Sequence, residues 1–310
     1  GNYTQEKEPK LSQVYNKKQP RGGHSGNSSH MEDDSSCDDY GTLDFNVNCF
    51  GFGKDHSAAL LNAISEQGNG TYSFIQDSSF VPIAFGECVG GLVSTVAQQT
   101  TLTITPLQTV VLNQVCASYV VTDDGPSKVV NITDIQSEES RDILIKLNLP
   151  STPYVQPFAL VQLTLSYLNC ATGQMVEEKS IVQIERTLEP TSQADARVDA
   201  QRNRLTAADV IETAEKLAAA GNLDEAKKLI DSTISAIRES VSGQETFVQG
   251  LLLDLEKVKA GFADTQTYQK QGHHWANELT TAHKKQRKTP QTSSYQTSSK
   301  NKYTTSYTNM

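Results

Sequence analysis

The sequence has few of the residues on which disulfide and metal chemistry depend. Its 310 residues include five cysteines, three methionines and one tryptophan, and no two cysteines have the C-x-x-C spacing. The odd number of cysteines and their wide separation argue against a disulfide framework and against a zinc site. We therefore expect reduced, buried thiols in a cytoplasmic protein.

Long apolar runs and nucleotide-binding loops are also missing. No stretch approaches the ~20 apolar residues of a membrane-spanning helix, and residues 1–9 are polar and charged, unlike a secretory signal. The G-x-x-x-x-G-K-[S/T] and G-x-S-x-G motifs do not occur. Gly51-x-Gly53 follows a predicted strand, but the third glycine of a dinucleotide loop would fall at His56. We expect no cofactor and no membrane span.

The charge is negative overall and unevenly distributed. The net charge is −9, with −8 in residues 49–190 and +5 in residues 273–310. An acidic body argues against nucleic-acid binding, because phosphate recognition needs a basic face. The basic tail either contacts an acidic partner or is only solvated.

The composition changes along the chain and predicts five parts. Residues 1–41 are low-complexity and residues 289–310 are almost entirely polar, so both are predicted to be disordered. The three parts between them are an α/β portion at 42–100, a β-sandwich-like domain at 101–189 and a helical module at 190–288. The predicted fold class is an α+β multidomain protein with a partial, Rossmann-like α/β remnant, an antiparallel β-sandwich and a bundle of about three to four helices.

Residues 42–100 show the strand–helix–strand–helix order of a parallel sheet. The expected elements are a strand over 43–49, a helix over 57–64, a strand over 71–75 and a helix over 80–99. Asp55 can cap the first helix, and Gly86, Gly90 and Gly91 would allow close packing of the second. Two strands cannot form such a sheet by themselves, because a parallel strand must be paired and covered.

The next two parts have different periods. About six or seven alternating segments between 101 and 189 predict a β-sandwich. From residue 191 the apolar spacing is helical, with breaks at 220–222 and 242–243. The short loops favour antiparallel packing of neighbouring helices.

Three sequence blocks resemble the last third of a von Willebrand factor type A (vWA) domain. They are Phe50-Gly51-Phe52-Gly53-Lys54-Asp55-His56, then Gly70-Thr71-Tyr72-Ser73-Phe74-Ile75, then Ala84-Phe85-Gly86-Glu87-Cys88-Val89-Gly90-Gly91-Leu92-Val93-Ser94. They are similar to the fifth strand, the sixth strand and the closing helix of that fold. The resemblance implies that residues 42–100 are a truncated vWA C-terminal portion, without its first two thirds.

The resemblance extends to a eukaryotic subgroup of vWA proteins. Residues 137–150 look like the β region that follows the vWA domain in that subgroup. Residues 197–287 resemble its C-terminal helical module, which is associated with vWA and hedgehog-intein-like domains. Related architectures carry a RING or U-box and are ubiquitin ligases, and neither domain is present here.

The departures from the family concern metal binding. An intact vWA domain binds a divalent cation through an Asp-x-Ser-x-Ser loop and later acidic and threonine residues, and residues 1–46 contain no such loop. The resemblance therefore implies Mg²⁺ or another divalent cation only for an intact domain. For this chain we expect no metal, catalytic or cofactor-binding residues.

Histidines offer two further readings that the sequence leaves open. His56 beside Asp55 is either a base or a residue that caps and packs a helix start. His273-His274-Trp275 with His283 is either a metal cluster or the end of an amphipathic helix that docks Trp275 against the bundle. The residues expected to contact a protein partner are Trp275, His283, Gln286 and Arg287.

The favoured function is a non-catalytic protein–protein interaction scaffold derived from a vWA protein, without the metal-ion-dependent adhesion site. The alternative is the substrate-recognition portion of a RING or U-box ubiquitin ligase that lacks its catalytic domain. Both predict a protein partner.

Overall fold

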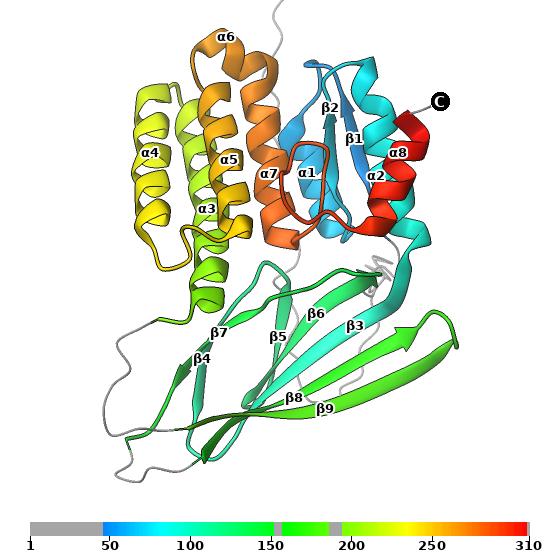
Figure 1. Cartoon of the computed structure of the whole chain (residues 1–310), viewed down its shortest axis with the longest axis vertical. Helices are drawn as coiled ribbons and strands as arrows, with labels where there is room; N and C mark the ends of the chain where they lie inside the picture. The colour runs from blue at the N-terminus through cyan, green and yellow to red at the C-terminus, as the bar shows by residue number, and fades with distance from the viewer. Residues whose placement is uncertain (1–45, 152–156, 186–193, 309–310) are drawn as a thin grey trace, which may run out of the picture. The chain divides into compact units, whose positions relative to one another are not determined.

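The computed structural model describes residues 46–151, 157–185 and 194–308 (Figure 1). The predicted disordered stretch 1–41 lies outside the described residues. The described chain contains an α/β part, an antiparallel β part and a helical part, which confirms the predicted fold class. None of the described helices has the length and apolar character that a membrane crossing requires.

The α/β part contains one pair of parallel strands. Its elements are β1 (Cys49–Phe52), α1 (Ala58–Gln67), β2 (Tyr72–Ile75), the 3₁₀ turn η2 (Ser78–Phe80) and α2 (Val81–Val93). Strands β1 and β2 pair in parallel, with Cys49 opposite Tyr72 and Phe52 opposite Ile75. The cap of α1 is Ser57, whose Oγ accepts a hydrogen bond from the Leu60 N–H, and not Asp55 as predicted.

The second predicted helix is shorter than expected, because its last residues join the β part. Helix α2 ends at Val93 with the C-cap at Ser94, and β3 begins at Thr95. The β-branched residues after Ser94 suit a strand, and neighbouring strands on both sides supply their hydrogen bonds. The boundary predicted at residue 100 therefore falls inside β3.

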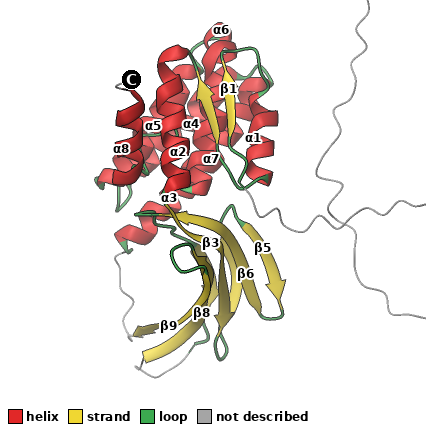
Figure 2. Ribbon diagram, turned by 90° about the vertical axis from the view of Figure 1, so that its right-hand side faces the viewer, coloured by secondary structure: helices red, strands yellow, loops and turns green. Residues whose placement is uncertain are grey.

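Two antiparallel sheets form the β part. The strands are β3 (Thr95–Pro106), β4 (Val111–Cys116), β5 (Val120–Asp124), β6 (Ser127–Gln136), β7 (Leu144–Asn148), β8 (Pro157–Asn169) and β9 (Gln174–Glu185). One sheet has the order β5-β6-β3-β8-β9 and curves strongly, and the other pairs β4 with β7 (Figure 2). Apolar residues of both sheets share one core, including Ile104, Val130 and Val161 from the larger sheet and Leu112 and Leu147 from the smaller.

The helical part is a bundle whose long helices are joined by short loops. Its elements are α3 (Ala196–Ala219), α4 (Leu223–Glu239), α5 (Thr246–Gly261), α6 (Thr265–Thr267), the π-helix η3 (Tyr268–Gly272) and α7 (His273–Lys285). Both predicted breaks, at 220–222 and 242–243, lie between these helices. Apolar residues from all four long helices form a single core, and α7 also packs against α1 and β2 (Figure 1).

The C-terminal segment differs from the predicted disorder. Residues 298–308 form helix α8 (Ser298–Thr308), which packs against α2. A Cβ atom added at Gly86 would lie 2.7 Å from Thr304 Cα, and one added at Gly90 would lie 3.1 Å from Lys300 Cα. The predicted role of these glycines in close packing is confirmed. The polar segment is ordered because the glycine surface of α2 gives it a place to pack, which its own composition does not reveal.

Candidate functional site

The outer edges of β1 and β2 have different surroundings. On the β2 side, Glu278 of α7 accepts a hydrogen bond from the Phe74 N–H, with 2.7 Å between Oε2 and N. On the β1 side, Cys49 and Gly53 donate their N–H groups inward to β2. The backbone groups of Phe50 point the opposite way, because successive residues of a strand alternate in direction. No strand within 46–151, 157–185 or 194–308 pairs with that edge of β1.

Helix α1 exposes apolar side chains beside this open edge. Its Asn62 and Glu66 face α7, where both accept from the Thr281 hydroxyl. Leu60 and Ile64 are one helical turn apart and lie on the side of α1 away from those residues. Since α7 stands beyond β2, this side of α1 faces the open edge of β1. The side chains of Leu60 and Ile64 are 51% and 42% exposed.

Helix α2 exposes a matching apolar set on the opposite face of the strand pair. The ring of Phe85 stacks on Phe50 of β1, with 4.6 Å between centroids and 4° between planes. Phe85 remains 44% exposed, Leu92 53% and Phe52 59%. We call the edge of β1 together with Phe52, Leu60, Ile64, Phe85 and Leu92 the open-edge surface. Clustered exposed apolar side chains of this kind mark interaction sites.

His56 lies in a buried chain of hydrogen bonds between β1, β2 and α7. Its Nε2 is 2.8 Å from the Tyr72 hydroxyl, which is 3.1 Å from His274 Nδ1. The rings of His56 and His274 stack with 4.3 Å between centroids. Burial lowers the pKa of His56, and it lowers that of His274 to about 3, so the His274 ring is neutral near pH 7. The structure therefore uses His56 in packing, and the helix cap is its neighbour Ser57.

The residues predicted to contact a partner lie largely inside the chain. His283 is fully buried, with Nε2 3.3 Å from Asp254 Oδ2 and Nδ1 3.0 Å from the Tyr295 hydroxyl. The Gln286 side chain accepts from the Asp142 N–H and donates to the Asp142 carbonyl. These two residues hold α7 against the β part and the C-terminal segment. They leave no surface for a partner, which corrects the prediction.

Arg287 and Trp275 are also used internally. Arg287 donates to the carbonyl oxygens of Asp134 and Asn69, at 2.8 and 3.3 Å. Trp275 packs on the cluster around β1 and β2, and its ring lies 5.3 Å from Lys257 Nζ. The predicted docking of Trp275 by the helix end is confirmed, although it docks against the α/β part as well as the bundle.

Glu139 is a buried carboxylate that joins three segments, and sequence reasoning missed it. Its oxygens lie 2.5 Å from Arg141 Nη2, 3.4 Å from Lys300 Nζ and 3.6 Å from Arg287 Nε. Burial alone would raise the pKa of Glu139, but the three cations outweigh it and hold the pKa below its usual value. The run Glu138-Glu139-Ser140-Arg141 looks like solvated loop, so only its position shows this role.

The described residues do not fit the cation that a vWA-type fold implies. Across these residues, no three histidine, cysteine, aspartate or glutamate side chains are grouped to hold a metal ion. Asp55 and Asp77, which follow β1 and β2, are exposed, and Asp77 Oδ1 accepts from the backbone and hydroxyl of Ser79. His273 and His274 are adjacent, whereas His283 pairs with Asp254 elsewhere. We therefore derive no chemistry through a metal.

The fold is similar to that of a solved vWA structure. A von Willebrand factor type A protein from Catenulispora acidiphila has a TM-score of 0.59 at 18% identity, over 83% of this chain and 60% of that one. The ArnB paralog VWA2 from Sulfolobus acidocaldarius has a TM-score of 0.42 at 14% identity, over 77% of this chain and 55% of that one. No curated protein matches the sequence. The chain has a vWA-like fold and spans 60% of its first structural neighbour.

One family model matches the helical region. Its description is "CPSF6-like, RSLD domain, N-terminal region", and the match covers residues 194–302. This description differs from the vWA and hedgehog-intein-like module expected for residues 197–287. The match extends into the first five residues of α8, which packs on α2, so it crosses the boundary predicted at residue 288.

Proposed function

We propose that this chain is a non-catalytic scaffold that binds an extended strand of a partner protein along the open edge of β1. The observation that carries the proposal is the edge of β1, which no described strand pairs with and which lies between two helices that expose apolar side chains. Recognition of this kind is β-strand addition: the main chain supplies hydrogen bonds, and alternate side chains enter flanking pockets.

The physics of parallel sheets supports this choice of occupant. Parallel strands are normally buried on both faces and paired at both edges, and an isolated pair is marginal. Here β2 is closed by Glu278, while the backbone groups of Phe50 and the N–H of Phe52 are directed outward. A third strand would satisfy those groups.

The side chains around the edge define the partner's chemistry. Leu60 and Ile64 lie over one face of the added strand, and Phe85 and Leu92 over the other. A strand with apolar residues on both faces would remove these side chains from water, at about 25 cal/mol for each Å² buried. We infer an uncharged, β-branched or aromatic segment of about four residues, matching the length of β1.

The vWA likeness supports the further proposal that the α/β part is a portion of a vWA-type domain without a metal-ion-dependent adhesion site. The imidazole of His56 in this part and the carboxylate of Glu139 after β6 take part in hydrogen bonds and ion pairs that hold the fold together. This use supports a binding role over catalysis.

The test places a photo-crosslinking phenylalanine analogue at position 52 or, as a control, at position 253 in the full chain. Leu253 is 62% exposed on α5 and Phe52 59% exposed on β1, so the two positions are matched in accessibility. We expect crosslinks at position 52 to one apolar extended segment, identified by mass spectrometry. The corresponding synthetic peptide should then bind the full chain and protect the amides of Phe50 and Phe52 from exchange.

Variants show whether the contact is strand addition. Phe52→Pro removes an outward N–H and keeps the inward pairing of β1, so it should abolish peptide binding, as should Phe52→Lys. Leu253→Lys should leave it unchanged. Peptide binding that survives both Phe52 variants would refute the proposal. A dimer of the unmodified chain that Phe52→Lys dissociates would also refute it, because the surface would then serve self-association.

A further inference from the structure

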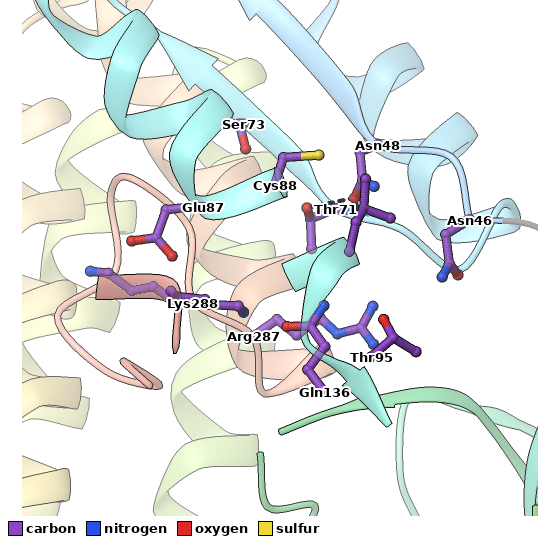
Figure 3. Close-up of a pocket in the computed structure, with 12 residues that line it drawn as sticks. Asn46, Asn48, Thr71, Ser73, Glu87, Cys88, Thr95, Gln136, Arg287 and Lys288 are labelled. Carbon is purple, nitrogen blue, oxygen red and sulfur yellow. Dashed lines mark hydrogen bonds between the residues drawn. The ribbon is translucent and has the colours of Figure 1, made fainter. Parts of the chain in front are cut away.

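A polar cavity lies below the sheet, at the N-terminal ends of β1 and β2. Asn48 and Thr71 precede the two strands, Ser73 faces it from β2, and Gln136 reaches it from β6 (Figure 3). The cavity has a volume of about 30 Å³, which is enough for one or two water molecules or one small ion. The cavity is separate from the open-edge surface. Leu92 is the one residue of that surface that also lines the cavity.

Positive charge predominates around this cavity. Arg287, Lys288 and Lys300 line it, together with one carboxylate, Glu87. Glu139 stands behind them and pairs with Arg287 and Lys300. Beyond the lining, Arg141 lies near Glu139, Asp134 lies near Arg287, and Asp254 and Glu278 act on Lys288. Three cations and one carboxylate thus line the cavity itself.

Three polar atoms of the lining lack hydrogen-bond partners among the described residues. They are Oε2 of Glu87, Oε1 of Gln136 and Nε of Arg287, each buried. Glu87 is 6% exposed and Arg287 7% exposed, so bulk water does not reach them freely. Buried polar groups are normally satisfied, and three such atoms around one cavity indicate a guest.

We propose that this cavity binds one small monovalent anion of the size of chloride, held by Arg287, Lys288 and Lys300. The three lining cations favour an anion, and the volume of about 30 Å³ suits one of the size of chloride. Arg287 Nε–H would donate directly to the ion. Gln136 can turn its amide so that the nitrogen points inward, since oxygen and nitrogen are interchangeable in shape.

Glu87 is compatible with an anion when it carries a proton. Burial raises the pKa of Glu87, although Lys300 and Lys288 act in the opposite direction. A protonated carboxyl would donate from Oε2 to the ion, while Oε1 accepts from the Thr304 hydroxyl. The ion would then link three elements: α2, the segment that follows α7, and helix α8. It would thereby hold the C-terminal helix against the α/β part.

The experiment measures chloride binding by ³⁵Cl NMR line broadening of the full chain, with gluconate holding the ionic strength constant. We expect saturable broadening with one site per chain, displaced by bromide and unaffected by sulfate. Crystals grown in bromide should show an anomalous peak between Glu87 and Lys288. Absence of saturable broadening, or equal displacement by sulfate, would overturn the proposal.

Charge variants assign the site. Lys288→Gln should weaken chloride binding at least about tenfold, and Lys302→Gln, an exposed control on α8, should leave it unchanged. Glu87→Gln keeps the size of the side chain and removes the negative charge, so it should tighten binding. This variant stays informative if Lys288→Gln fails to fold by circular dichroism. Binding that Glu87→Gln leaves unchanged would place the ion elsewhere and refute the assignment.

Discussion

Glu278 and Phe74 are 204 residues apart in sequence and are joined by a 2.7 Å hydrogen bond from the Phe74 N–H to Glu278 Oε2. The other carboxyl oxygen accepts from the Gln291 N–H at 3.1 Å. One fully buried side chain on α7 therefore closes the outer edge of β2 and fixes the start of the C-terminal segment. Burial raises the pKa of Glu278 to about 7.

Removing this side chain should destabilise the fold. Glu278→Ala leaves the N–H groups of Phe74 and Gln291 buried without acceptors, which should cost about 2–4 kcal/mol in urea unfolding. The control Glu256→Ala removes a partly exposed carboxylate that pairs with Arg238 and Lys259, and should cost less than about 1 kcal/mol. Similar costs for both variants would contradict the role of Glu278.

The raised pKa of Glu278 predicts a definite pH dependence. Between its ordinary value of 4.5 and about 7, the folded chain keeps a proton that the unfolded chain has lost. Stability from this group is therefore full below about pH 4.5 and declines as the pH rises toward 7. Glu278→Gln does not titrate, so its unfolding free energy should lack this decline. If the unfolding free energies of the variant and the original chain change with pH in parallel, Glu278 is not the source of the decline.

His274 should give the opposite slope. Its pKa is lowered to about 3, first by burial and then by His273 and His56, from an ordinary value of 6.5. Between these values the unfolded chain binds a proton that the folded chain does not, so stability falls as the pH drops from 6.5 toward 3. His274→Phe loses the bond to Tyr72 and some stability, but its unfolding free energy should depend less on pH in that range. If the unfolding free energy of His274→Phe changes with pH between 6.5 and 3 as much as that of the original chain, His274 does not cause the change.

The Glu139 network should be sensitive to the loss of one charge. Glu139→Gln leaves Arg141, Arg287 and Lys300 without their shared carboxylate, and breaking a buried pair costs about 3–5 kcal/mol. The comparison is Glu212→Gln, which removes a more exposed partner of Lys216 and Lys284 and should cost about 0–1 kcal/mol. The unfolding free energies of both variants are measured by chemical denaturation. If Glu139→Gln lowers the unfolding free energy only slightly, water reaches the network.

The glycines of α2 predict a graded effect on α8. Gly86→Ala would place a methyl 2.7 Å from the Thr304 backbone, whereas Gly90→Ala would place one 3.1 Å from Lys300 Cα. Alanine favours the helix itself by about 1 kcal/mol, so any loss must come from the contact. Hydrogen exchange over residues 298–308 should accelerate strongly for Gly86→Ala and less for Gly90→Ala. If residues 298–308 are equally protected from exchange in the two variants, contacts other than those at Gly86 and Gly90 hold α8.

Local sequence determined the type and order of most secondary structure. Alternation predicted the strands of the β part, helical spacing predicted the bundle, and both helix breaks fall where predicted. The end of α2 could not be predicted, because Thr95 to Gln99 become a strand only when β6 and β8 are alongside.

Tertiary structure alone decided which polar residues are buried and which apolar residues stay exposed. His283, Gln286 and Arg287 have the composition of a helix end in water, yet they are enclosed because α7, the β part and the C-terminal segment meet there. Leu60 and Ile64 have the spacing of a core, yet they stay exposed because no further strand of the described residues pairs with β1. A sequence encodes local periodicity in neighbouring residues, whereas burial depends on segments that are distant along the chain.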